Sequence, residues 1–141
     1  MRARPMLIAW VAAAALACSQ STGTSTPSIV AGAWTYAGTQ ASPSPATLDG
    51  TVTWQGVAGG DGAFEGTFTL SERLPTGATR TLSGPGAGNL LADTVADFDL
   101  TVDGVARRHI GVLHADSIKG SWATLETGQN ASGNFVLRRK P

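Results

Sequence analysis

The segment VADFDLTVDGVARRHIGVL, residues 95–113, decides the fold of this chain. Apolar and polar residues alternate on either side of the Asp103-Gly104 pair, which is the period of a strand with one buried face. Asp-Gly is a strong signal for a two-residue hairpin turn. Such a turn sets Val102 opposite Val105. The segment therefore predicts an antiparallel hairpin whose register is fixed by its turn.

Two further turns carry this register toward the C-terminus. Turns at Ala115-Asp116 and Thr127-Gly128 continue one inner face through the next two strands. The residues predicted to face inward are mostly large and apolar: Phe98, Leu100, Val102, Leu113, Ile118, Trp122, Phe135 and Leu137. The other face is mostly polar, with Ile110 and Val112 as exceptions: Asp97, Asp99, Arg108, Lys119, Ser121, Ser132 and Asn134. A slip of one residue would exchange the faces, so this agreement supports the register.

The rest of the chain alternates in the same way, and no segment shows sustained helical spacing. The candidate strands are Val30–Tyr36, Thr47–Gln55, Ala63–Glu72, Thr79–Ser83, Gly88–Asp93, Val95–Val102, Val105–Leu113, Ser117–Leu125 and Ala131–Arg139. The Pro/Ser-rich patch Ala41–Pro45 is expected to form a long loop. An open meander would leave two exposed edges. The sequence therefore predicts an all-β fold, an antiparallel up-and-down meander closing into a small barrel of about eight to nine strands.

The first strand contains Gly32-Ala33-Trp34, and a basic residue, Arg139, stands late in the last strand. Together with an antiparallel meander, this pattern resembles the calycin superfamily of lipocalins and avidins. In those barrels the tryptophan closes one end and a basic side chain packs across it. The resemblance implies that Trp34 closes this barrel and that Arg139, which the register turns inward, is its partner. It implies no particular ligand.

The N-terminal residues have a different character. Arg2 and Arg4 precede an apolar run, Met6–Ala17, that is too short to span a bilayer and is typical of an export signal. The only cysteine follows at once, and Ala15-Leu16-Ala17-Cys18 resembles the lipobox of bacterial lipoproteins. The resemblance implies that residues 1–17 are removed and that Cys18 carries the lipid anchor. The alternative is a plain secreted protein with a stray cysteine.

This processing divides the chain into three parts. The signal peptide is residues 1–17, a tether rich in Ser, Thr, Gly and Pro is residues 18–28, and a single β-barrel domain is residues 29–141. In bacterial lipoproteins, serine at the position of Ser19 is compatible with outer-membrane sorting. The expected location is therefore the bacterial cell envelope, anchored by lipid, in the outer membrane.

Composition bears on several classes of function. The chain has 10 basic and 10 acidic residues, and loss of Arg2 and Arg4 with the signal leaves it slightly acidic, so no nucleic-acid surface is expected. A single cysteine cannot form a disulfide within the chain, so the fold must rest on an apolar core.

The sequence shows no catalytic or metal-binding pattern. His109 and His114 should point to opposite faces, which argues against a shared metal site. The aspartates of the outer face should be solvated, with Asp99 paired to Arg108 across the hairpin. No nucleophile elbow, phosphate loop or zinc signature occurs in the sequence. We therefore expect no metal, no cofactor and no enzymatic activity.

The candidate ligand-binding residues are Arg107, His109 and Trp122, which the register places on the apolar face. Buried polar groups need partners. One interpretation is that Arg107 and His109 line a lumen and orient a ligand beside the aromatic wall of Trp122. The other is that they lie near a barrel mouth, satisfied by water or backbone, or that a bulge turns them outward.

Two functional hypotheses remain at this point. The first is a lipid-anchored module that binds a small apolar or amphipathic molecule in its barrel. The second is a structural or interaction lipoprotein with a filled barrel that contacts another envelope protein. A continuous apolar cavity would favour the first, whereas a solid core with an exposed patch near Ile110 and Val112 would favour the second.

Overall fold

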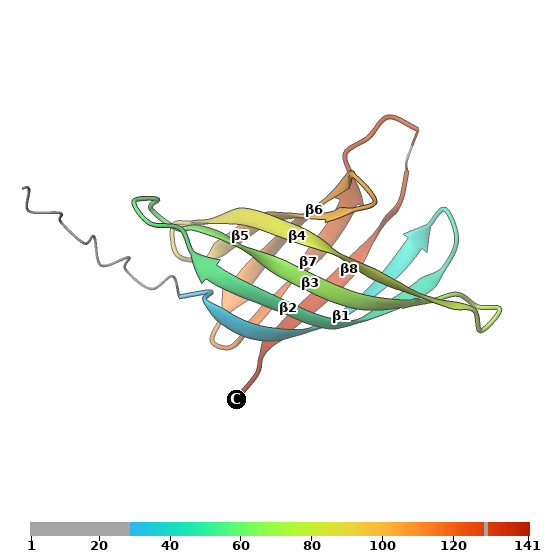
Figure 1. Cartoon of the computed structure of the whole chain (residues 1–141), viewed down its shortest axis with the longest axis horizontal. Coiled ribbons are helices and arrows are strands. Elements are labelled where there is room, and N and C mark those ends of the chain that lie inside the picture. The colour runs from blue at the N-terminus through green and yellow to red at the C-terminus, as the bar shows by residue number, and fades with distance from the viewer. Residues whose placement is uncertain (1–28, 129) are drawn as a thin grey trace, which may run out of the picture.

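The computed structural model describes residues 29–128 and 130–141. These residues form eight strands and no helix: β1 (Gly32–Ser42), β2 (Ala46–Gly56), β3 (Ala63–Arg73), β4 (Thr79–Leu91), β5 (Val95–Val102), β6 (Val105–His114), β7 (Ser117–Thr124) and β8 (Ser132–Arg139). Each strand pairs antiparallel with the next, and β8 returns to pair with β1, so the sheet closes into a barrel (Figure 1). The predicted all-β meander and its closure are confirmed.

The predicted register is also confirmed. Asp103 and Gly104 both have positive φ angles, 50° and 79°, as a tight two-residue hairpin turn requires. Val102 pairs with Val105 across that turn, and two strands later Trp122 pairs with Gly133. The inner face predicted from the turns is therefore the buried face of the barrel.

The structure corrects the prediction for residues 79–93. The sequence predicts two short strands there, whereas β4 runs unbroken from Thr79 to Leu91, so the barrel has eight strands, within the predicted eight to nine. Glycines that resemble breaks give room to neighbouring side chains instead. A Cβ on Gly86 would lie 2.8 Å from the ring of Trp54 and 2.9 Å from the side chain of Leu100. Glycine here allows close packing within a strand.

The expected long loop at residues 41–45 is also wrong. Strand β1 continues to Ser42 and β2 begins at Ala46, so three residues connect the two strands. Gln40 still pairs with Ala46, and its side-chain amide donates a hydrogen bond to the Ser44 carbonyl at 2.9 Å. These contacts hold the two prolines in a short connection.

The core of the barrel contains a layer of aromatic rings. The rings of Tyr36, Phe98, His109 and Phe135 contact one another near the middle of their strands. Trp54 adjoins this layer through an edge contact with Phe98. The middle of the barrel is therefore filled by protein, as small barrels commonly are.

Candidate functional site

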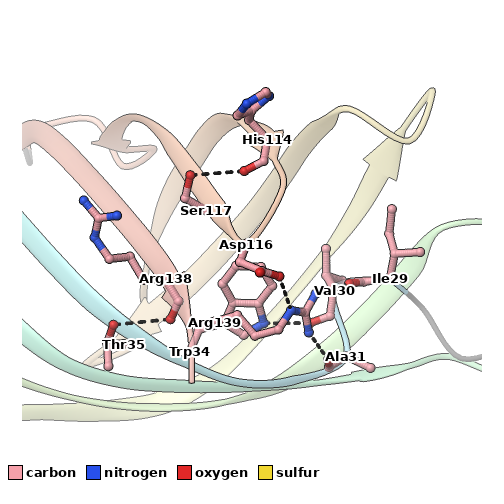
Figure 2. A network of polar contacts seen from close by, with 10 residues as sticks. All are labelled: Ile29, Val30, Ala31, Trp34, Thr35, His114, Asp116, Ser117, Arg138 and Arg139. Atoms are coloured by element: carbon pink, nitrogen blue, oxygen red, sulfur yellow. Dashed lines mark hydrogen bonds and ion pairs between the residues drawn. The ribbon is translucent and has the colours of Figure 1, made fainter. Parts of the chain in front are cut away.

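One end of the barrel is covered by Trp34 and Arg139 (Figure 2). Trp34 is fully buried, and its indole N–H donates to the Val30 carbonyl at 2.8 Å. The guanidinium carbon of Arg139 lies 4.4 Å from the centroid of the Trp34 ring, within range of cation–π attraction. Arg138, by contrast, is exposed. The structure thus brings together the two residues that the family resemblance pairs.

Arg139 also holds the chain that enters β1. Its Nη1 donates to the Ala31 carbonyl at 2.8 Å, its Nη2 donates to the Ile29 carbonyl, and its Nε lies 3.3 Å from the Asp116 carboxylate (Figure 2). Val30, between these contacts, is fully buried. We call the end of the barrel that Trp34 and Arg139 cover the closed end. The opposite end, where β5 turns into β6, is called the mouth.

His109 lies within the aromatic layer between the two ends. Its ring stacks on Phe98, with centroids 4.8 Å apart, and meets Phe135 edge-on at 4.9 Å. Its Nδ1 is 2.8 Å from the Arg107 carbonyl oxygen, and its Nε2 is 3.0 Å from the Tyr36 hydroxyl. Because a carbonyl only accepts, Nδ1 carries the hydrogen, and the bare Nε2 accepts the hydrogen of the Tyr36 hydroxyl.

Burial keeps this histidine and tyrosine neutral. Burial lowers the pKa of His109 to about 3, although the hydrogen bond to the Arg107 carbonyl acts in the opposite direction. Burial also raises the pKa of Tyr36 above its usual range, against the charge of Arg107. Both ring nitrogens of His109 already have partners within the protein. A ligand contact by His109 would have to break one of these bonds, and that role stays a prediction.

Arg107 lies two residues before His109, on the mouth side of the aromatic layer. It is 9% exposed, and its guanidinium carbon lies 5.0 Å from the centroid of the Trp122 ring. Its guanidinium makes no hydrogen bond or ion pair with any residue that the structure describes. Burial lowers the pKa of Arg107, while the charge of Glu72 raises it. The site therefore contains a nearly buried cation whose donors are unused.

The pairing of β6 with its two neighbouring strands shows no bulge. Arg107 and His109 therefore point inward, and the outward orientation left open by the sequence does not occur.

Trp122 on β7 packs against the guanidinium of Arg107. The register partner of Trp122 on β8 is Gly133, which has no side chain. The Trp122 indole N–H reaches β1 and donates to the Thr39 carbonyl at 3.2 Å. The ring is therefore fixed by its polar edge as well as by the guanidinium.

Sequence reasoning missed a second charged group at the mouth. Glu72 on β3 is buried, and its carboxylate forms an ion pair with Nε of Arg80, its register partner on β4. Arg80 also lies 3.9 Å from Asp103. Alternation along β3 puts Glu72 on the same face as Phe68, so side-chain parity alone could have located it.

A pocket of about 260 Å³ lies at the mouth beside these charges. It is lined by Arg80, Val102, Asp103, Val105 and Arg107. Pockets for drug-sized ligands occupy roughly 300 to 1,000 Å³. The volume therefore suits a small molecule, or one end of a larger one.

On the outer face, Arg108 pairs with a different aspartate from the one predicted. Asp99 is its register partner, but the Arg108 guanidinium donates to both carboxylate oxygens of Asp97, at 2.9 and 2.6 Å. These hydrogen bonds hold the pKa of Asp97 below its usual value. A long arginine side chain reaches the diagonal neighbour in a sheet, which register alone does not specify.

Ile110 and Val112 point outward, as the register predicts, and are 46% and 57% exposed. Leu91 of β4 pairs with Val95 of β5, and Val95 pairs with Val112 of β6. These side chains form an apolar patch on the outer wall toward the closed end. We call Leu91, Val95, Ile110 and Val112 the outer patch.

His109 is buried and His114 is exposed, on opposite faces as expected. Within residues 29–128 and 130–141, no cluster of His, Cys, Asp or Glu could hold a metal ion. The same residues include no helix suited to crossing a membrane. The predicted signal peptide, the predicted lipid attachment at Cys18 and the predicted tether lie outside the described residues.

Comparison with known proteins identifies the fold. No family model matches the sequence, and no curated protein matches it. A redesigned β-barrel, mFAP1, bound to DFHBI is similar with a TM-score of 0.60 and 14% identity, over 78% of this chain and 94% of that one. A fluorescence-activating β-barrel designed de novo has a TM-score of 0.52 and 17% identity, over 78% of this chain and 93% of that one. At such identities the likeness establishes a shared barrel fold.

Proposed function

We propose that this chain is a lipid-anchored protein of the bacterial cell envelope whose barrel binds a small amphipathic molecule at its mouth. The observation that carries the binding proposal is the guanidinium of Arg107, nearly buried and without a polar partner among the described residues. Its nitrogens are not sealed from solvent, so water reaches them at the mouth, and a ligand in the adjoining pocket would supply acceptors in place of that water.

The pocket has the mixed lining that an amphipathic ligand needs. Val102 and Val105 contribute apolar surface, while Arg107 contributes donors and has its guanidinium over the Trp122 ring. The aromatic layer fills the middle of the barrel and Trp34 covers the closed end. The proposed ligand therefore occupies the mouth rather than a long lumen.

Precedent for the fold supports small-molecule binding. Two of the similar designed barrels, mFAP1 and mFAP2b, are bound to DFHBI. They show that a barrel of this kind can bind a small molecule, and they give no identity for a ligand of this chain.

We propose a binding protein rather than an enzyme. The buried histidine has both nitrogens occupied, and its pKa of about 3 does not suit a general base near neutral pH. The anchoring part of the proposal rests on the sequence alone: the basic N-terminus, the apolar run Met6–Ala17 and the cysteine that follows. Several acyl chains on Cys18 would give durable attachment.

The second candidate is an interaction lipoprotein with a filled barrel. The outer patch favours it, because Leu91, Ile110 and Val112 are each about half exposed on one wall. The aromatic layer is equally consistent with a barrel that serves only as a scaffold. The two candidates predict binding at different places.

A fluorescent probe separates the two candidates. N-phenyl-1-naphthylamine, which is uncharged and amphipathic, should bind the purified protein, and Val105→Trp should fill the pocket and weaken binding at least about tenfold. The matched control is Val112→Trp, which places the same side chain on the outer patch and should leave binding unchanged. Binding that is lost in Val112→Trp instead, or absent from the unmodified protein, would contradict a site at the mouth.

A further inference from the structure

We infer that the ligand at the mouth is an anion whose carboxylate is held by Arg107. This inference rests on the proposed function and adds the chemical class of the ligand. It follows from which donors at the mouth are unused, which charges are already compensated, and what shape of acceptor the site can admit.

A guanidinium has five N–H donors in one plane, and Arg107 uses none of them within the described part of the chain. Its guanidinium carbon lies over the Trp122 ring, 5.0 Å from the ring centroid. Hydrogen bonds to a guanidinium lie in its plane, where a carboxylate can accept two of them in parallel.

The other charged groups at the mouth are paired or exposed: Glu72 is buried but forms an ion pair with Arg80. Asp103 has a side chain that is 82% exposed, so water screens most of its field. Arg107 is thus the buried charge that lacks a paired opposite charge. In agreement, burial outweighs the attraction of Glu72 and lowers the pKa of Arg107.

Arg107 lines the 260 Å³ pocket together with Arg80 and Asp103, so an anion entering there meets two arginines and one exposed aspartate, which lies 3.9 Å from Arg80. Val102 and Val105 form the apolar part of the same wall. A small aryl or alkyl carboxylate matches this arrangement: its acidic group reaches Arg107 while its apolar part packs on the valines.

The alternative is that Arg107 only seals the mouth by stacking on Trp122. The two roles differ in one measurable property, the difference in affinity between a charged ligand and a neutral one. If Arg107 only seals the mouth, two ligands of the same shape bind equally well whatever their charge. The test therefore uses a matched pair of probes, 1-naphthylacetate and 1-naphthylacetamide, which have nearly the same shape and differ in charge. Their affinities for the purified protein are measured by calorimetric titration near pH 7 at low salt.

We expect naphthylacetate to bind at least about tenfold more tightly than the amide. Arg107→Gln should abolish this preference, and Arg107→Lys should retain only part of it because lysine cannot offer the planar pair of donors. Arg108→Gln is the matched control: it removes the neighbouring arginine on the outer face and should leave the preference intact. Near-UV circular dichroism establishes that each variant is folded.

Each outcome decides the inference. Equal affinity for the two probes, or a preference that survives in folded Arg107→Gln, would overturn it, and binding of the neutral naphthylamine would then still support the proposed function. If naphthylacetate fails to bind at about 10 mM while the naphthylamine binds at the mouth, the inference of an anionic ligand is overturned and the proposed function stands. If the naphthylamine does not bind, the proposed function falls as well.

Discussion

Lowering the pH from about 7.5 to about 4.5 should reduce the free energy of unfolding by about 2.5 kcal/mol through His109 alone. The folded protein holds this imidazole neutral because burial lowers its pKa to about 3. In the unfolded chain a histidine titrates near 6.5. Between these two pKa values the unfolded state binds a proton that the folded state does not. The contribution of His109 to stability therefore decreases as the pH falls, and it is present in full only above the pKa of the unfolded state.

The surroundings of His109 explain the size of this effect. Its ring lies against Phe98, Phe135 and Tyr36, and the positive charge of Arg107 on the same strand also disfavours protonation. No carboxylate of the described residues forms an ion pair with this imidazole. The carboxylate of Asp97, whose pKa is lowered, titrates below the chosen window and adds little there.

Urea denaturation of the purified protein at the two pH values measures the loss. His109→Gln, which cannot titrate, should remove most of the pH dependence even if its stability at neutral pH is reduced. His114→Gln is the matched control, since His114 lies on the same strand but is exposed. A wild-type loss below about 1 kcal/mol, or an imidazole NMR titration that places the pKa of His109 near 6.5, would refute the reasoning.

Two other predictions concern the ends of the chain. Trp34→Ala should reduce the free energy of unfolding by about 3 to 5 kcal/mol, because it leaves a large cavity under Arg139; a denaturation curve close to wild type would contradict closure by this residue. Cys18→Ser should release the protein from the membrane fraction or leave the signal peptide uncleaved. An intact mass of the native mature protein with an unmodified thiol at Cys18 would rule out lipid attachment there.

Side-chain parity and turn chemistry together predict most of this fold. The Asp103-Gly104 turn specifies the register of β5 and β6, and two later turns extend it to β8, because every side chain in a strand has a fixed face once one pair is set. The same parity places Arg107 and Trp122 inward together. What predicted the candidate site was therefore backbone geometry rather than a motif.

The errors have a common physical origin. Gly84 to Gly88 resemble a break, but glycine has two uses in a strand, and only the neighbouring strands reveal that Trp54 and Leu100 require the space. Likewise, the choice of Asp97 over Asp99 by Arg108 depends on the direction of a long side chain, which the register does not determine. The predicted break in β4 and the predicted partner of Arg108 are both wrong because they depend on three-dimensional neighbours that local sequence does not specify.

The polar groups inside the barrel fall into two kinds, and this difference locates the function. His109 and Tyr36 satisfy each other deep in the aromatic layer, so they have no free capacity for a ligand. The indole N–H of Trp54 has no hydrogen-bond partner among the described residues, but this residue is 2% exposed and its ring packs edge-on against Phe64 and Phe98, away from any pocket at the mouth.

Arg107 also lacks a partner, yet it differs from Trp54 in charge and in access. The N–H of Trp54 is sealed from solvent, whereas the guanidinium nitrogens of Arg107 are not, so water can reach them at the mouth. A pocket adjoins Arg107 there, so a molecule from solvent can accept its hydrogen bonds in place of water without opening the core. Because a ligand gains most where the protein alone is least satisfied, the mouth at Arg107 is where binding by this barrel should be sought.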